Sequence, residues 1–177
     1  MKYNLLICGL LLLLCYGCGD STVASQKNAH TYFDLKGFFE KERARLSQSN
    51  PLILKTVMVN DSSESKQLRI ADWKKELSAF SDADMNRAAW KGLFQIRKTT
   101  SGVAYTTDSK KVPVKEVLVM ERNGKLYGLQ ILIRNSTTLY TSSDTLSYYP
   151  DSLYEVKKSQ NIRLLSEKNY RITGKFK

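Results

Sequence analysis

The chain has 177 residues, 42% of them hydrophobic, and a formal net charge of +11. The length beyond the first 17 residues suits one ordinary domain with its own core. His30 is the only histidine, which excludes Ser-His-Asp triads, Cys-His dyads and histidine-rich zinc sites.

The first 17 residues have the outline of a signal peptide. Lys2 supplies the positive end, an apolar run covers residues 5–14, and Gly17 stands immediately before Cys18. The run has ten residues, whereas a helix that spans a membrane needs about 20 apolar residues. We therefore expect no permanent membrane span here.

Residues 14–18, Leu-Cys-Tyr-Gly-Cys, resemble the lipobox of bacterial lipoproteins, in which a small residue precedes the cysteine that becomes lipidated. Cys15 and Tyr16 depart from the usual Leu and Ala or Ser. The resemblance implies that Cys18 carries acyl chains such as palmitate and holds the mature protein on a cell-envelope membrane. Asp20 resembles an acidic sorting signal, and the outer membrane is the expected address. The alternative is that Cys18 is an incidental cysteine of the leader.

Composition changes again after the leader. Residues 18–31 are small and polar and predict a flexible tether, and residues 32–177 are expected to form a single domain. All three cysteines lie within residues 1–18, so we expect neither a disulfide nor a thiolate metal site in the domain, and no cofactor.

The N-terminal part of the domain has helical and hairpin signals. Asp34 is expected to cap a helix that runs to about Leu46. The aromatic face of this helix either packs in the core or touches lipid, and packing in the core is favoured. Residues 52–59 and 66–70 predict a hairpin around a polar turn. Asp72 is expected to cap a short second helix.

The hydrophobic period becomes mostly two from Leu93 onward, with polar turn signals that include residues 159–161, which indicates a meander of antiparallel strands. Asn123-Gly124 is the strongest local signal, a two-residue hairpin turn. Continued without interruption, its register places Glu116 opposite Ile131 on a core face. Glu116 is then either a buried carboxylate or lies at a strand end that water or a basic partner reaches. The other residues of that predicted face are Val114, Leu118, Met120, Tyr127, Leu129 and Ile133.

Together these signals predict an α+β domain. N-terminal helices would pack on a curved, mainly antiparallel sheet of about 8–10 strands, similar to a half-barrel. In outline this resembles the lipoprotein carriers and small accessory lipoproteins of bacterial envelopes, a fold-level analogy only.

Basic residues dominate the C-terminal part of the chain. Alternation along the last strand puts Arg171, Lys175 and Lys177 on a solvent face, opposite apolar residues that face the core. Lys157 and Arg163 add to the basic character of this region. Nucleic acid is not an expected partner, because the chain is built for export and has no basic run interleaved with aromatics. Anionic lipid, an anionic glycan or an envelope protein is the expected partner, and a merely solvated basic surface is the alternative.

Two sequence motifs resemble known catalytic or metal-binding motifs, but both matches are weak. Residues 63–66, Ser-Glu-Ser-Lys, match the S-x-x-K pattern of penicillin-binding enzymes, but in a polar turn and without the accompanying motifs. Residues 82–86 resemble the start of a calcium loop, yet Arg87 and Leu93 replace its glycine and glutamate, and helix capping is preferred. The expected function is therefore a non-catalytic envelope lipoprotein that binds an apolar or anionic ligand or a partner protein. The alternative is an enzyme that acts on envelope glycan or lipid through carboxylates.

Overall fold

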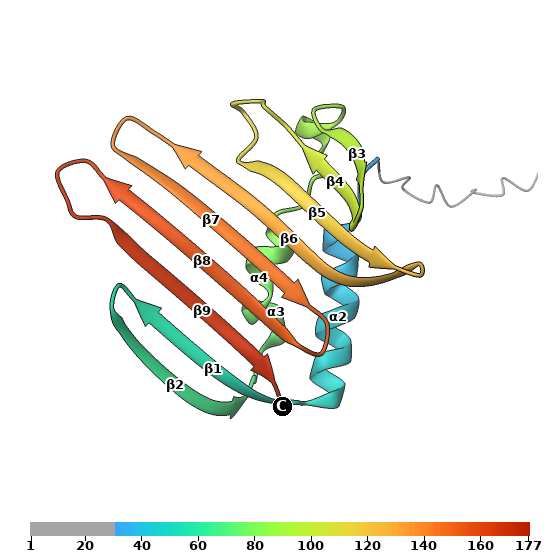
Figure 1. The fold of residues 1–177 in the computed structure, drawn as a ribbon, viewed down its shortest axis with the longest axis vertical. Helices are drawn as coiled ribbons and strands as arrows, with labels where there is room; N and C mark the ends of the chain where they lie inside the picture. Colours follow the sequence, from blue (N-terminus) through green and yellow to red (C-terminus); the bar gives the residue numbers. More distant parts are fainter. Residues whose placement is uncertain (1–30) are drawn as a thin grey trace, which may run out of the picture.

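The computed structural model describes residues 31–177, which form one open, nine-stranded antiparallel sheet with helices on one of its faces (Figure 1). The helices are α2 (Leu35–Ser49), α3 (Trp73–Glu76), α4 (Ser78–Asp82) and the short 3-10 helix η1 (Ala88–Trp90). The strands are β1 (Leu52–Val59), β2 (Ser62–Arg69), β3 (Gln95–Thr99), β4 (Gly102–Thr106), β5 (Val114–Arg122), β6 (Lys125–Ser136), β7 (Tyr140–Tyr149), β8 (Leu153–Ile162) and β9 (Lys168–Phe176). The predicted α+β class and the strand number are confirmed.

The strand order is β2-β1-β9-β8-β7-β6-β5-β4-β3. Strands β3 to β9 form the predicted meander, since each pairs with the next along the chain. The last strand then pairs with β1, so that Ile53 lies opposite Phe176. The C-terminal strand is thereby inserted between β1 and β8, and the β1–β2 hairpin forms one edge of the sheet.

Local capping chemistry determines where the helices begin. Asp34 accepts a hydrogen bond from the Gly37 amide at 2.9 Å, and Asp72 accepts one from the Lys75 amide at 3.0 Å. Each carboxylate satisfies an amide that has no partner within the first helical turn. Both predicted caps are confirmed, and Phe39 of α2 is buried in the core.

Two predicted turns differ from the structure. Asn60 adopts a positive φ of 50°, which closes a tight β1–β2 turn, and β2 therefore begins at Ser62 rather than at residue 66. The polar residues 159–161 were expected to form a turn but continue strand β8, because their neighbours on β7 pair with them throughout.

The β5–β6 hairpin has the predicted turn but not the predicted register. Asn123 and Gly124 both have positive φ, 53° and 71°, as a type I′ turn requires. The register shifts after the first two pairs, and Met120 lies opposite Gly128. Tyr127 is the extra residue of this bulge.

This shift exchanges the two faces of β5 from Glu116 to Met120, and a second register shift between Val114 and Glu116 keeps Val114 on the predicted core face. A slip of one residue moves every side chain to the opposite face, and the core side of the hairpin carries Val117, Val119, Leu129 and Ile131. Glu116 pairs with Leu132 on the outer face, where it is half-buried. The hypothesis that Glu116 lies on the core face is therefore wrong. The bulge brings Val117 and Val119 onto the core face in place of Leu118 and Met120, whereas Leu129 and Ile131 lie there as predicted.

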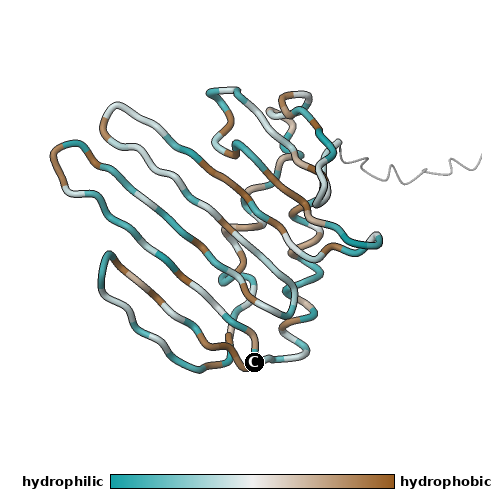
Figure 2. Tube along the Cα trace, viewed as in Figure 1, coloured by the Kyte–Doolittle hydropathy of each residue, from teal (hydrophilic) through white to brown (hydrophobic). Residues whose placement is uncertain are grey.

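The core lies between the helices and the central strands. Phe39 of α2 contacts Phe80 of α4 and Tyr148 of β7, with ring centroids 5.1 and 5.2 Å apart. Trp73 of α3 stacks on Phe176 with its centroid 6.0 Å away. The most hydrophobic stretches lie along β1, β5 and β6, whereas the edge strand β2 is largely hydrophilic (Figure 2).

The helices cover only part of their face of the sheet. In Figure 1 they lie behind the lower right of the sheet, and the far halves of β7, β8, β9 and the β1–β2 hairpin extend beyond them. Val57 and Val59 of β1 are accordingly exposed, although they alternate with the core residue Ile53. Within residues 31–177, none of the helices has the length and apolarity needed to cross a membrane.

Candidate functional site

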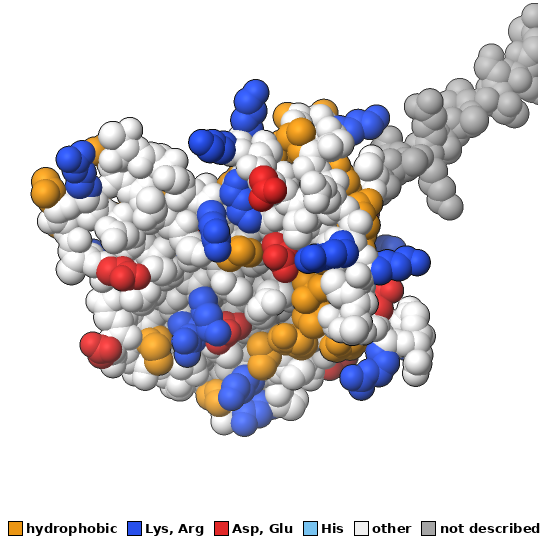
Figure 3. Space-filling model, turned by 45° about the horizontal axis from the view of Figure 1, so that its top comes forward, with side chains coloured by type: hydrophobic (Ala, Val, Ile, Leu, Met, Phe, Trp, Pro, Cys, Tyr) orange, Lys and Arg blue, Asp and Glu red, His pale blue; other side chains and the backbone are white. Residues whose placement is uncertain are grey.

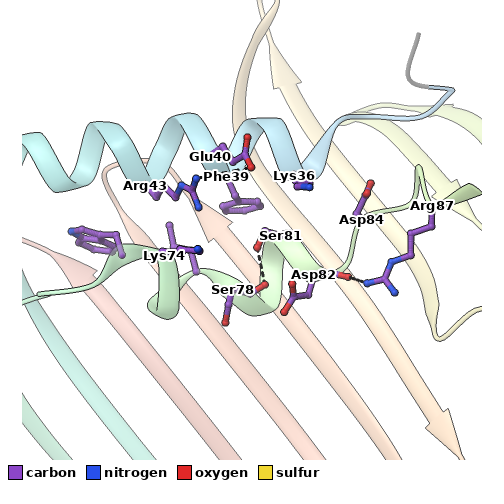
Figure 4. Close-up of a pocket in the computed structure, with 12 residues that line it drawn as sticks. Lys36, Phe39, Glu40, Arg43, Lys74, Ser78, Ser81, Asp82, Asp84 and Arg87 are labelled. Carbon is purple, nitrogen blue, oxygen red and sulfur yellow. Dashed lines mark hydrogen bonds and ion pairs between the residues drawn. The ribbon is translucent and has the colours of Figure 1, made fainter. Parts of the chain in front are cut away.

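Two grooves flank the α3–α4 segment, one on each side. The first, of about 530 Å³, separates this segment from α2 and is shown in Figure 4. Its base includes Phe39, Trp73 and Leu77, whereas its rim is charged. The charged rim residues are Lys36, Glu40, Arg43, Lys74, Asp82, Asp84 and Arg87.

The charges of this first groove are of both signs and are partly engaged with one another. Arg43 lies 4.0 Å from Glu40, and Arg87 donates a hydrogen bond of 2.6 Å to the Asp82 carbonyl. Four basic residues against three acidic ones leave little net field for selecting an ion. The groove is a polar surface cleft without a clear preference for one class of ligand.

Residues 82–86, considered above as a calcium loop, serve as a structural turn. Asp84 accepts a hydrogen bond of 2.9 Å from the Asn86 amide. The side chain of Asn86 in turn donates to the carbonyls of Tyr32 and Phe33, at 3.3 and 3.2 Å. Among residues 31–177 no cluster of three metal-ligating side chains is present. These hydrogen bonds connect residues 32 and 33, at the start of the domain, to the segment that follows α4.

The second groove, hereafter the α3 groove, lies between α3 and the part of the sheet that the helices leave uncovered. It has a volume of about 650 Å³, and β1, β2, β8 and β9 contribute to it. Pockets that hold small ligands have volumes of about 300–1,000 Å³. Its apolar lining consists of Leu68, Ile70, Ala71, Ala79, Val156 and Ile172. Its size and lining suit an apolar ligand.

A hydrogen-bonded network forms the polar end of the α3 groove. The Lys55 ammonium group lies 2.7 Å from Glu76 Oε1, and the Tyr154 hydroxyl donates to the same oxygen at 2.7 Å. The ring of Tyr154 is fully buried, while Lys55 and Glu76 each keep a small exposed area. Burial, and then the bond to the Glu76 carboxylate, raise the pKa of Tyr154 well above its usual range. Tyr154 is therefore a neutral donor at physiological pH.

A matching network holds the other side of the helical layer. Tyr148, the cross-strand partner of Tyr154, donates its hydroxyl to Glu42 of α2. Glu42 also accepts two hydrogen bonds from Arg45, at 3.0 and 2.9 Å. Burial, and then the bond to Glu42, raise the pKa of Tyr148 well above its usual range.

These two networks, hereafter the tyrosine anchors, connect neighbouring strands to α2 and α3. Sequence reasoning missed them because Tyr148 and Glu42 are 106 residues apart, and Tyr154 and Glu76 are 78 residues apart. No local pattern links residues at such separations.

Gly174 is required where the Tyr154 ring crosses β9. A Cβ atom at this position would lie 2.1–2.4 Å from three atoms of the Tyr154 side chain. No real Cβ contact is that short, so glycine alone allows the ring to lie flat across the strand. The position of the Tyr154 hydroxyl at the α3 groove thus depends on β9.

The predicted basic residues lie in three places in the structure. Lys157 and Arg171 are cross-strand partners on the outer face, and Lys175 lies on the same face of β9. We refer to these three as the basic stripe. Like charges directly opposite each other repel, and Glu155 compensates them, 2.9 Å from Lys157 and 3.9 Å from Arg171. Lys177 follows the end of β9, and Arg163 lies in the β8–β9 turn.

The other predicted site residues do not converge. Residues 63–66 lie exposed on the edge strand β2, and Glu116 has Leu132 and Thr106 as its cross-strand neighbours, neither of them a carboxylate. Cys18 lies outside the described residues.

Comparison with known proteins adds no relative. No family model matches the chain, and neither a curated protein nor a solved structure is significantly similar to it.

Proposed function

We propose that this protein is a non-catalytic binding protein of the cell envelope that takes the apolar chain of an amphiphile in its α3 groove. One observation carries the proposal: a groove of about 650 Å³ with an apolar lining opens beside uncovered, partly hydrophobic sheet. Each methylene removed from water contributes about 0.8 kcal/mol. A chain of several methylenes thus provides enough free energy to offset part of the loss of translational freedom on binding.

The polar end of the groove suits an anionic head group. Lys55, Arg69 and Lys75 all line the groove, against Asp72 and Glu76. Asp72 is engaged as the cap of α3, and Glu76 by Lys55 and Tyr154. Arg69 and Lys75 would then contact a carboxylate or phosphate directly, while the apolar lining holds the attached chain.

A membrane tether agrees with such a ligand. Cys18 at the end of the leader would carry the lipid, and the polar residues 18–31 would keep the domain close to the bilayer, preferably the outer membrane. Replacement of Cys18 by Ala should release the protein from the membrane fraction and remove the acyl mass from the intact protein. Unchanged partitioning would refute the proposed lipid anchor but would leave the proposed ligand binding in the α3 groove unaffected.

The alternative, an enzyme that uses carboxylates, has less support. Glycoside hydrolysis needs two carboxyl groups that face one bond. At the groove, Glu76 is already bonded to Tyr154 and Lys55. Asp72 is already bonded to the first turn of α3. Glu116 is on the other face of the sheet. Their geometry supports structure rather than catalysis.

Retained lipid is the direct test of the groove. Native mass spectrometry of the purified protein should show a bound amphiphile, and a fluorescent fatty acid should bind and be displaced by it. Ile172→Trp fills the groove and should weaken binding at least about tenfold, which is the effect of 1.4 kcal/mol. Thr173→Trp is the matched control, because it lies on the same strand but on the outer face. Equal affinity of both variants would overturn the assignment of the groove.

A further inference from the structure

Two hairpin turns lie side by side at the corner of the sheet that the helices do not reach. The β6–β7 and β8–β9 turns both end at the upper left of Figure 1. The Arg163 amide donates a hydrogen bond of 2.9 Å to the Leu139 carbonyl, and Tyr140 pairs with Ile162. These bonds join the two turns into one structure, hereafter the hairpin tip, whose outermost side chains are Leu139, Tyr140, Arg163, Leu164 and Leu165.

The leucines of the hairpin tip are far more exposed than leucines usually are. Leu164 is 97% exposed, Leu139 68% and Leu165 61%. Leu164 also has a φ of 71°, a left-handed conformation that glycine and asparagine adopt much more readily. This leucine therefore serves neither the core nor the turn. An apolar surface of three exposed leucines, one of them in an unfavourable conformation, is typical of a contact with something outside the chain.

We propose that the hairpin tip inserts into the interfacial region of an anionic phospholipid bilayer. A stable protein interface involves about 20–30 residues on each side, and a convex point with three leucines offers far fewer. A bilayer, by contrast, accommodates a small projecting apolar group, with cationic side chains remaining at the level of the head groups.

The charge around the tip fits this partner. Arg163 stands directly before Leu164, and Lys168 begins the strand that follows, while Glu167 of the same turn accepts a hydrogen bond from Ser159. Figure 3 shows exposed hydrophobic side chains beside basic ones at the left end of the molecule. Residues 31–177 carry 26 Lys and Arg against 16 Asp and Glu. An anionic surface would therefore attract the domain, and the leucines would then enter it.

This surface is distinct from the α3 groove, and the inference does not depend on the ligand proposed there. The groove is lined by residues of the helical layer and of β1, β2, β8 and β9, and none of its lining residues belongs to the hairpin tip. Loss of groove binding in Ile172→Trp would leave insertion of the tip unchanged.

Tryptophan fluorescence in the full-length protein tests the proposal. Leu164→Trp places an indole on the tip, while native Trp73 and Trp90 are buried and supply a constant background. The protein is reconstituted into vesicles of equal parts phosphatidylcholine and phosphatidylglycerol, with bromine atoms on the acyl chains as quenchers. The matched control is Ile96→Trp, an exposed apolar position on the edge strand β3, away from the hairpin tip.

Insertion predicts that Leu164→Trp is quenched at least about threefold more than Ile96→Trp, with emission shifted to the blue. Vesicles of phosphatidylcholine alone should reduce the difference, because the cationic attraction is lost. Adding Leu139→Asp and Leu165→Asp to Leu164→Trp should at least halve the quenching, without a change in melting temperature. Equal quenching of Leu164→Trp and Ile96→Trp in anionic vesicles, whether both are high or both are low, would overturn the proposal.

Discussion

Raising the pH above 10 should weaken the fold through the two tyrosine anchors. Tyr148 and Tyr154 are fully buried, and their pKa values lie well above the ordinary value of about 10. In the unfolded chain both hydroxyls ionise near pH 10, whereas in the folded protein both stay protonated. A group whose pKa is raised by folding contributes stability below its unfolded pKa, and this contribution is lost as the pH rises towards its folded pKa.

The size of the effect follows from proton linkage. At about pH 11 the unfolded chain gains about 1.4 kcal/mol for each tyrosine, or about 2.8 kcal/mol for the pair. This is a large share of the roughly 5–15 kcal/mol that separates most folded domains from their unfolded chains. The buried position of both rings makes screening by solvent small.

Urea unfolding followed by far-ultraviolet circular dichroism, between about pH 8 and pH 11, measures this loss. The variant Tyr148→Phe/Tyr154→Phe should be less stable than the parent at pH 8 by about 1.5–3 kcal/mol for each lost bond to a carboxylate. Its further loss between pH 8 and pH 11 should be smaller than that of the parent by about 2.8 kcal/mol.

Tyr127→Phe/Tyr140→Phe is the matched control, because both tyrosines are exposed. This control should keep the full pH dependence of the parent. The reasoning is refuted if Tyr148→Phe/Tyr154→Phe loses as much stability between pH 8 and pH 11 as the parent does.

Three further changes test other parts of the structure. Gly174→Ala should lower the free energy of unfolding in urea by about 1–3 kcal/mol, since its Cβ would clash with the Tyr154 ring. Adding Tyr154→Val should restore part of the loss. An unchanged free energy of unfolding would show that the ring does not cross β9. Gly124→Val should lower stability by about 1 kcal/mol or more, because a β-branched residue resists a positive φ; a melting temperature equal to that of the parent would contradict the turn. Arg171→Glu/Lys175→Glu should fold normally but reduce the binding of anionic vesicles at low salt, each charge near an anionic surface being worth about 1 kcal/mol. If vesicle binding depends neither on salt nor on this substitution, the basic stripe is only a solvated surface.

Local chemistry was sufficient for several elements of this fold. Asp34 and Asp72 identify helix starts because a carboxylate there satisfies amides of the next turn, whatever the rest of the chain does. Asn123-Gly124 identifies a hairpin because few other pairs adopt positive φ twice. Alternation along β9 likewise separates Arg171 and Lys175 from Ile172 and the core, as the structure confirms. Each of these signals acts within a few residues.

The register of β5 and β6 needed the tertiary structure. The turn predicted an uninterrupted ladder, but core packing selects the bulge at Tyr127, which places Val117 and Val119 under the helices and moves Glu116 outward. A period of two is the same for both registers, so alternation within one hairpin could not distinguish them.

The candidate site and the hairpin tip also emerged only in three dimensions. The α3 groove exists because β1 pairs with β9 and brings Lys55 near Tyr154, residues that are distant in sequence. The hairpin tip exists because two separate turns end at one corner of the sheet. The sequence by itself determined the helix caps, the main hairpin turn and the basic character of β9. Which residues meet across the sheet, and which apolar ones remain exposed, was decided by packing between segments that no local rule connects.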